Sequence, residues 1–135
     1  MAQELRLPFV HVYQSRLPGI SVPILITRDS STVALVLPID TGAEYCFFER
    51  SIGEQLGPTI EDGNYRGVRT VNSRFDAYGH EVTISAFGIE TVSTVYFYAD
   101  PLIRRSVLGR RGWVDRVRLG LIDHDCELYL AAYND

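Results

Sequence analysis

A run of apolar, strand-forming residues that ends on a carboxylate is the first feature of this chain with chemical potential. Residues 32–39 read TVALVLPI, and Asp40, Thr41 and Gly42 follow at once. A glycine lets the backbone turn sharply and brings its N–H close to a carboxylate, and a threonine adds a hydroxyl that can bond to another loop. We therefore expect the triplet to hold one acid in a rigid turn.

One acid held in this way does little chemistry alone, but two that face each other do more. Two carboxylates at close range cannot both ionise, so the pair shares one proton. One member then acts as a base and the other as an acid. Such a pair can activate water against a peptide carbonyl and protonate the leaving amine. The alternative for this triplet is a plain turn after a strand, because Asp and Gly are common turn residues.

The residues on both sides of this acid resemble the aspartic peptidases, and in layout the retropepsins, which are the retroviral-type members. IDTGA (39–43) is similar to the first motif of that family, and SVLGR (106–110) to its second. The residues 109–130 look like the helix and closing strands of bacterial members, so that the resemblance covers about residues 18–132.

The resemblance implies a role for each residue of the two motifs. Asp40 would be catalytic, and the second motif would thread behind its loop. In the family the arginine of the second motif pairs with the acid that lies two residues beyond the DTG glycine. The corresponding pair in this chain is Arg110 with Glu44. The alternative is that these two residues form an ordinary surface ion pair, which contributes little. The supporting residues are Thr41, Gly42, Ala43, Glu44 and Arg110, with Val107, Leu108 and Gly109 behind the site.

A hairpin between the two motifs would be the substrate-binding flap. Residues 65–85 have β-branched and aromatic residues around a polar centre at Asn72 and Ser73, which predicts a hairpin tip there. The flap residues are Thr70, Val71, Asn72, Ser73, Arg74 and Phe75. This tip is bulkier than the glycine-rich tip usual in the family, and Pro38 replaces the usual plain apolar residue before the catalytic turn.

The count of such acids determines the expected assembly. The chain holds one DTG triplet in 135 residues and is too short for a second lobe. An active peptidase would therefore be a homodimer, with Asp40 of each subunit on the two-fold axis. Residues 3–18 are expected to form either a strand of the dimer interface or a covering segment.

The remaining pattern favours a mainly β protein: a small closed, barrel-like retropepsin fold in one domain over residues 1–135, with one or two short helices. Strands are expected at 20–28, 32–39, 91–99, 117–122 and 126–133, and short helices at 47–57 and 110–117. The DHDCE stretch (123–127) is expected to be a polar turn rather than a metal site, because adjacent strand residues point to opposite faces. Trp113 is expected in the core, and His11 and His80 in structural or exposed positions.

Composition limits the classes of partner. The chain is 46% hydrophobic and 22% charged, with a net charge of −4, which argues against nucleic acid or an anionic membrane. The arginines at 103–118 alternate with apolar residues and are interpreted as solvated faces of a packed element. No signal peptide, transmembrane run or CxxC spacing is present, so Cys46 and Cys126 are expected as reduced thiols in the cytoplasm.

The favoured interpretation is thus an aspartic endopeptidase that cleaves peptides or unfolded proteins without a metal or other cofactor. Two alternatives stay open. One is a dimeric peptide-binding module that keeps the fold but is catalytically silent. The other is a domain that works only with a different partner subunit.

Overall fold

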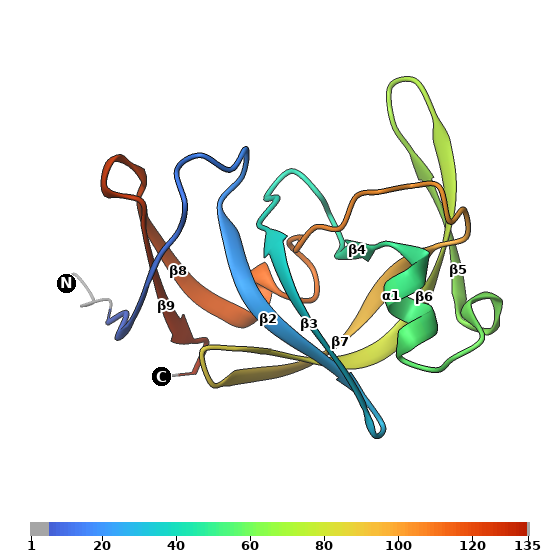
Figure 1. Ribbon diagram of the computed structural model, residues 1–135, viewed down its shortest axis with the longest axis horizontal. Helices are drawn as coiled ribbons and strands as arrows, with labels where there is room; N and C mark the ends of the chain where they lie inside the picture. Colours follow the sequence, from blue (N-terminus) through green and yellow to red (C-terminus); the bar gives the residue numbers. More distant parts are fainter. Residues whose placement is uncertain (1–5, 135) are drawn as a thin grey trace.

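The computed structural model describes residues 6–134, and these fold into short strands with few helices (Figure 1). The fold is mainly β, as the sequence predicts. The strands are β1 (Phe9–Val12), β2 (Ser21–Arg28), β3 (Ser31–Pro38), β4 (Phe47–Phe48), β5 (Asn64–Arg69), β6 (Arg74–Ala86), β7 (Ile89–Tyr98), β8 (Val117–Ile122) and β9 (Glu127–Ala132). The helices are α1 (Arg50–Gln55) and the short 3-10 helices η1 (Ile60–Asp62), η2 (Val114–Arg116) and η3 (Asp123–Asp125).

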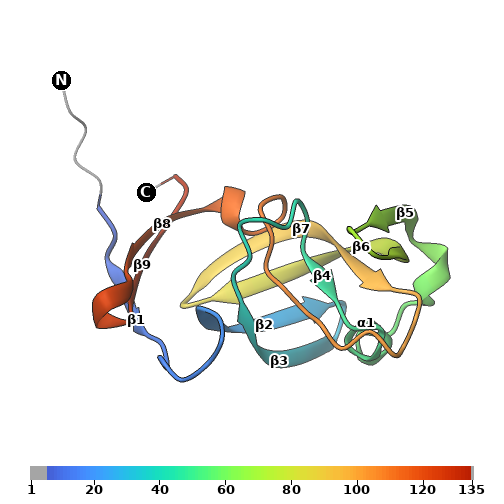
Figure 2. The same ribbon diagram turned by 90° about the horizontal axis from the view of Figure 1, so that it is seen from above.

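Two hydrogen-bonded sheets form within the described residues. The larger has six strands in the order β3-β2-β6-β7-β4, with β5 paired to β6 beside this path. The smaller has the order β1-β9-β8. Figure 2 shows the small sheet at the end of the molecule where both termini lie, and the β5–β6 hairpin at the opposite end.

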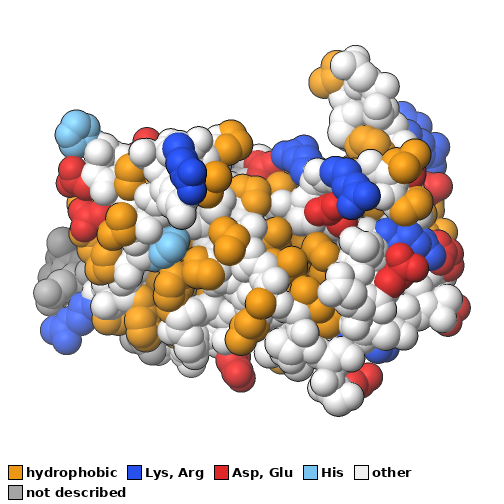
Figure 3. Space-filling model, viewed as in Figure 1, with side chains coloured by type: hydrophobic (Ala, Val, Ile, Leu, Met, Phe, Trp, Pro, Cys, Tyr) orange, Lys and Arg blue, Asp and Glu red, His pale blue; other side chains and the backbone are white. Residues whose placement is uncertain are grey.

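The core follows from alternation along β2. Val22, Ile24 and Ile26 are buried, whereas Pro23 and Leu25 between them are exposed. The buried residues pack into one cluster with Phe48, Phe97, Leu108 and Trp113, so the predicted core position of Trp113 is confirmed. A second, smaller cluster contains Phe47, Ala77, Tyr96, Tyr98 and Val107. Figure 3 shows hydrophobic side chains across the middle of one face, with charged side chains gathered below the protruding hairpin.

Both predicted helices are shorter than expected, each for a tertiary reason. Residues 47–48 form β4 instead of a first helical turn, because they pair in parallel with Tyr96 and Phe97 of β7. The second helix shrinks to η2, because the N–H groups of Arg110 and Arg111 donate to the carbonyls of Ala43 and Glu44.

The closing hairpin and the N-terminal stretch form the small sheet. Residues 123–125 form η3 between β8 and β9, which confirms a turn in the DHDCE stretch. Residues 9–12 form β1, which pairs with β9 of the same chain; the other edge of β1 is unpaired among the described residues. Residues 3–18 were predicted as a dimer strand or a cover, and residues 3–5 of that stretch lie outside the described residues. His11 and His80 have structural partners, the carbonyls of Ser21 (3.0 Å) and Ile60 (2.8 Å). Within residues 6–134 there is no helix of the length and apolarity needed to span a bilayer.

Candidate active site

Asp40 lies in a tight turn directly after β3, and local hydrogen bonds orient it. The N–H of Gly42 donates to Oδ1 of Asp40 at 2.9 Å, and the N–H of Ala43 donates to the Asp40 carbonyl at 3.1 Å. The Asp40 side chain is 28% exposed, and Thr41 and Gly42 beside it are exposed as well. The turn therefore presents a carboxylate at the surface on a backbone that is anchored from inside.

The anchor is the segment 107–110, which runs between the two arms of this turn. The N–H of Asp40 donates to the Leu108 carbonyl, and the N–H of Leu108 donates to the Pro38 carbonyl, both at 2.9 Å. Val107 exchanges two backbone hydrogen bonds with Phe47, at 2.8 and 3.2 Å. Pro38, which lacks an N–H, is tolerated because β3 is an edge strand and its carbonyl is the group in use.

Gly109 is packed so tightly that only glycine fits. A methyl group added there would overlap the backbone carbonyl of Tyr45. The N–H of Gly109 faces Sγ of the buried Cys46 at 3.3 Å. Burial raises the pKa of this thiol to about 11. Cys46 is thus a neutral packing residue beneath the turn, and both cysteines are free thiols.

The prediction that Glu44 pairs with Arg110 is wrong, because Glu44 pairs with Arg111. Nε of Arg111 lies 3.2 Å from Oε1 of Glu44, and both side chains are more than half exposed. Arg110 meets the loop only through its backbone N–H, which donates to Ala43 at 2.9 Å. The backbone register is the reason: Arg111 N donates to the Glu44 carbonyl at 2.7 Å, which puts the side chain of Arg111 beside that of Glu44.

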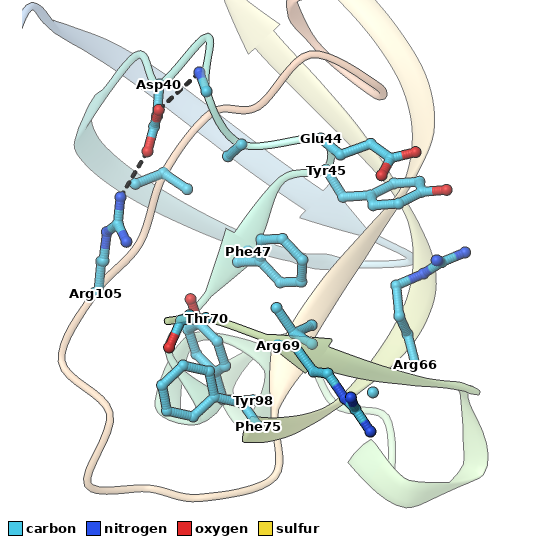
Figure 4. A pocket seen from close by; sticks show the side chains of 15 residues that line it. Asp40, Glu44, Tyr45, Phe47, Arg66, Arg69, Thr70, Phe75, Tyr98 and Arg105 are labelled. Carbon is cyan, nitrogen blue, oxygen red and sulfur yellow. Dashed lines mark hydrogen bonds and ion pairs between the residues drawn. The ribbon is translucent and has the colours of Figure 1, made fainter. Parts of the chain in front are cut away.

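A cleft of about 530 Å³ opens between the Asp40 turn and the β5–β6 hairpin (Figure 4). Of the predicted site residues, Asp40, Gly42, Ala43, Glu44, Thr70, Phe75 and Val107 line it. The other lining residues are Tyr45, Phe47, Arg66, Gly67, Val68, Arg69, Tyr98 and Arg105.

The floor of the cleft is aromatic. Phe47 stacks on Tyr98 with ring centroids 5.8 Å apart, and Phe75 meets Tyr98 edge-on at 6.0 Å. Tyr45 meets Tyr96 edge-on at 5.1 Å. Burial raises the pKa of Tyr98 above its ordinary value, so its phenol is neutral at ordinary pH. The cleft therefore offers an aromatic surface beside the carboxylate of Asp40.

The predicted flap is a hairpin made by β5 and the first part of β6. The N–H of Thr70 donates to the Ser73 carbonyl at 2.8 Å and closes the tip that the sequence placed at Asn72 and Ser73. Val71 at this tip is fully exposed. Thr70 and Phe75 face the cleft, whereas Val71, Asn72, Ser73 and Arg74 are not among its lining residues.

The sequence did not predict the arginines of the cleft. Nη2 of Arg105 lies 2.6 Å from Oδ2 of Asp40. Arg66 places its guanidinium 4.1 Å from the ring centroid of Tyr45 and 5.0 Å from that of Tyr96. Period-two alternation along β5 is a signal that could have found Arg66, because it shares a face with Val68. Arg105 carries no such signal, because it lies in an irregular loop.

A metal site would require a group of ligating side chains among the described residues. Among residues 6–134, no three or more His, Cys, Asp or Glu side chains are grouped so as to hold a metal ion.

Comparison with solved structures identifies the fold. The chain superposes on the EIAV protease in complex with the inhibitor HBY-793, with a TM-score of 0.56 and 20% sequence identity. The match covers 73% of this chain and 88% of that chain. No protein-family model matches the sequence, and no curated protein matches it. The chain therefore has a retropepsin-like fold.

Proposed function

We propose that this chain is an aspartic endopeptidase of bacterial retropepsin type that works as a homodimer with one Asp40 from each subunit. The position of Asp40 carries the proposal. It is an oriented and partly exposed carboxylate on the wall of an aromatic cleft, opposite a hairpin that can cover a substrate. Glu44, the other acid that lines the cleft, is already paired with Arg111.

The chemistry follows from two such carboxylates at close range, which share one proton. The ionised Asp40 takes a proton from water as the water oxygen attacks the peptide carbonyl, and the protonated Asp40 donates to the carbonyl oxygen. A proton then passes to the leaving nitrogen as the C–N bond breaks. Neither step requires a metal.

An extended peptide is the substrate that suits this cleft. Within the described residues β5 pairs only with β6, so its outer edge has backbone N–H and C=O groups to offer. Residues 66–70, at the end of this strand, line the cleft. A peptide or an unfolded segment of a protein would add as a further strand there, with its side chains over the aromatic floor. The free thiols agree with a reducing compartment such as the cytoplasm.

Cleavage of unfolded proteins and of a peptide library tests this function. The Asp40→Asn variant should lose at least about a hundredfold in kcat/KM, because acid–base catalysis contributes that much or more. Asp62→Asn, which changes an exposed acid outside the cleft, is the matched control and should keep full activity. Cleavage that persists in Asp40→Asn would refute the mechanism. A protein that stays monomeric by sedimentation during turnover would refute the dimer.

A second candidate is a dimeric peptide-binding module without turnover. The contact between Arg105 and Asp40 favours it, since a positive side chain occupies an oxygen that a shared proton would need. Under this alternative the native protein binds unfolded peptides and cleaves none between pH 4 and 8. Turnover that depends on Asp40 would exclude it.

A further inference from the structure

Both oxygens of Asp40 have a donor in this structure. Oδ1 accepts the N–H of Gly42 at 2.9 Å, and Oδ2 lies 2.6 Å from Nη2 of Arg105. A proton-sharing pair needs an oxygen free to face the partner carboxylate and the water. Arg105 must therefore leave Oδ2 before hydrolysis begins, and a 65% exposed side chain has room to move.

The loop that carries Arg105 restricts where this side chain can go. Its neighbour Arg104 is paired outside the cleft, with Nη1 3.6 Å from Oε1 of Glu49, and neither residue lines the cleft. The hydroxyl of Ser106 accepts the N–H of Glu49 at 3.0 Å, which ties the next residue down. Arg105 itself lines the cleft, so a group bound in the cleft is the natural alternative partner for its guanidinium.

The charges of the cleft indicate what that group is. Arg66, Arg69 and Arg105 line it against Asp40 and Glu44, so it is formally positive in a chain whose net charge is −4. Of the two acids, Glu44 is paired with Arg111. A cleft of this sign attracts carboxylates and repels basic side chains.

Two arginines of the flap strand line the cleft in which such a ligand would lie. Arg66 is held over Tyr45, and its Nε is buried with no hydrogen-bond partner among the described residues. Arg69 is exposed and makes no ion pair within residues 6–134 that would neutralise it. Guanidinium groups bind carboxylates well because their donors match the spacing of the two oxygens.

We propose that the cleft selects peptides with a Glu or Asp side chain next to the scissile bond, and that Arg105 is the residue that selects them. The acidic side chain takes Arg105 from Asp40, so the same exchange that binds the substrate frees Oδ2 for the shared proton. Arg66 and Arg69 bind acids further along the peptide. This inference rests on the proposed peptidase function for its catalytic half, whereas the selection of acidic peptides can be measured as binding alone.

The binding arm of the test uses Asp40→Asn protein and two pools of decapeptides that differ only in Glu against Gln at one central position, so that any contribution of Arg66 and Arg69 is the same for both pools. Arg105 in that variant has no competing carboxylate, so the Glu pool should bind about fivefold to tenfold more tightly in fluorescence anisotropy. Adding Arg105→Gln should abolish the difference, and Arg105→Lys should keep part of it because the charge remains. Arg104→Gln, the matched control outside the cleft, should leave it unchanged. Equal binding of the two pools would overturn the proposal.

The catalytic arm uses the same pools with the native chain. Wild type should cleave the Glu pool with a kcat/KM about tenfold above that for the Gln pool, and Arg105→Gln should cleave both pools alike. Activity of the Arg105→Gln variant on the Gln pool should exceed that of wild type, because Asp40 is no longer occupied. A Glu preference in binding without any turnover would refute the peptidase function and leave the acidic selection standing. If kcat/KM is the same for both pools and is unchanged by Arg105→Gln, the selection of acidic peptides is refuted, whereas the peptidase function is retained.

Discussion

The N–H of Asp40 donates to the carbonyl of Leu108 at 2.9 Å, which ties the candidate catalytic turn to the segment 107–110. The buried Leu108 belongs to the main core cluster, so the position of the carboxylate is set by the packing of the whole large sheet. Substitutions in this segment should therefore act on stability and on the site together.

Gly109→Ala should destabilise the protein by about 3 kcal/mol or more. The added methyl overlaps the Tyr45 backbone carbonyl, and backbone, unlike a long side chain, has little freedom to move aside. Chemical denaturation monitored by tryptophan fluorescence is the measurement, because Trp113 is the only tryptophan in the chain and is 1% exposed. The control is Gly57→Ala. A methyl group added at Gly57 has no other atom within 4 Å, so the only cost is that of placing alanine at a φ of 101°. This substitution should cost about 1 kcal/mol. Equal costs for the two substitutions would contradict the close packing at Gly109.

The ion pair of Glu44 with Arg111 should contribute about 0.5 kcal/mol, because both partners are more than half exposed. A double-mutant cycle with Glu44→Gln and Arg111→Gln measures this coupling in the free energy of unfolding. The same cycle with Arg110→Gln should show no coupling, since Arg110 contacts the loop through its backbone. Coupling of Glu44 to Arg110 instead of Arg111 would show that the two side chains exchange places in solution.

Cys46 should resist alkylation in the native protein. Its pKa of about 11 leaves roughly one thiol in a thousand or fewer ionised near neutral pH, and its side chain is fully buried. Cys126 is half-buried and should react first. Iodoacetamide followed by mass spectrometry should therefore find one label in native protein and two in denaturant. Early labelling of Cys46 would show that the turn above it opens readily.

The same thiol should make stability fall at alkaline pH. Its folded-state pKa lies above the ordinary value of 9.0, so its contribution is complete below pH 9 and is lost as the pH rises towards 11. The loss should reach about 3 kcal/mol in the free energy of unfolding once the pH exceeds 11. Cys46→Ala should lose less over the same range, which separates this thiol from other groups that titrate there. Identical pH curves for the two proteins would rule the effect out.

Much of the fold could be predicted from local pattern. Alternating and β-branched residues placed strands at 20–28 and 32–39, and the structure has them at Ser21–Arg28 and Ser31–Pro38. The polar centre at Asn72 and Ser73 predicted the hairpin tip, because a tip exposes its side chains whatever the sheet pairs with. The predictions erred where another segment competes for backbone groups, as at Phe47 and Phe48, which pair with β7.

The sequence by itself determined that an acid follows an apolar strand in a small-residue turn, because strand alternation and turn chemistry act between neighbours in the chain. Only the tertiary structure decided that Arg105 meets Asp40, and that Arg111 instead of Arg110 meets Glu44. The direction of an arginine side chain in a loop depends on the backbone register against a distant segment. A shift of one residue in that register would turn the other guanidinium towards the acid.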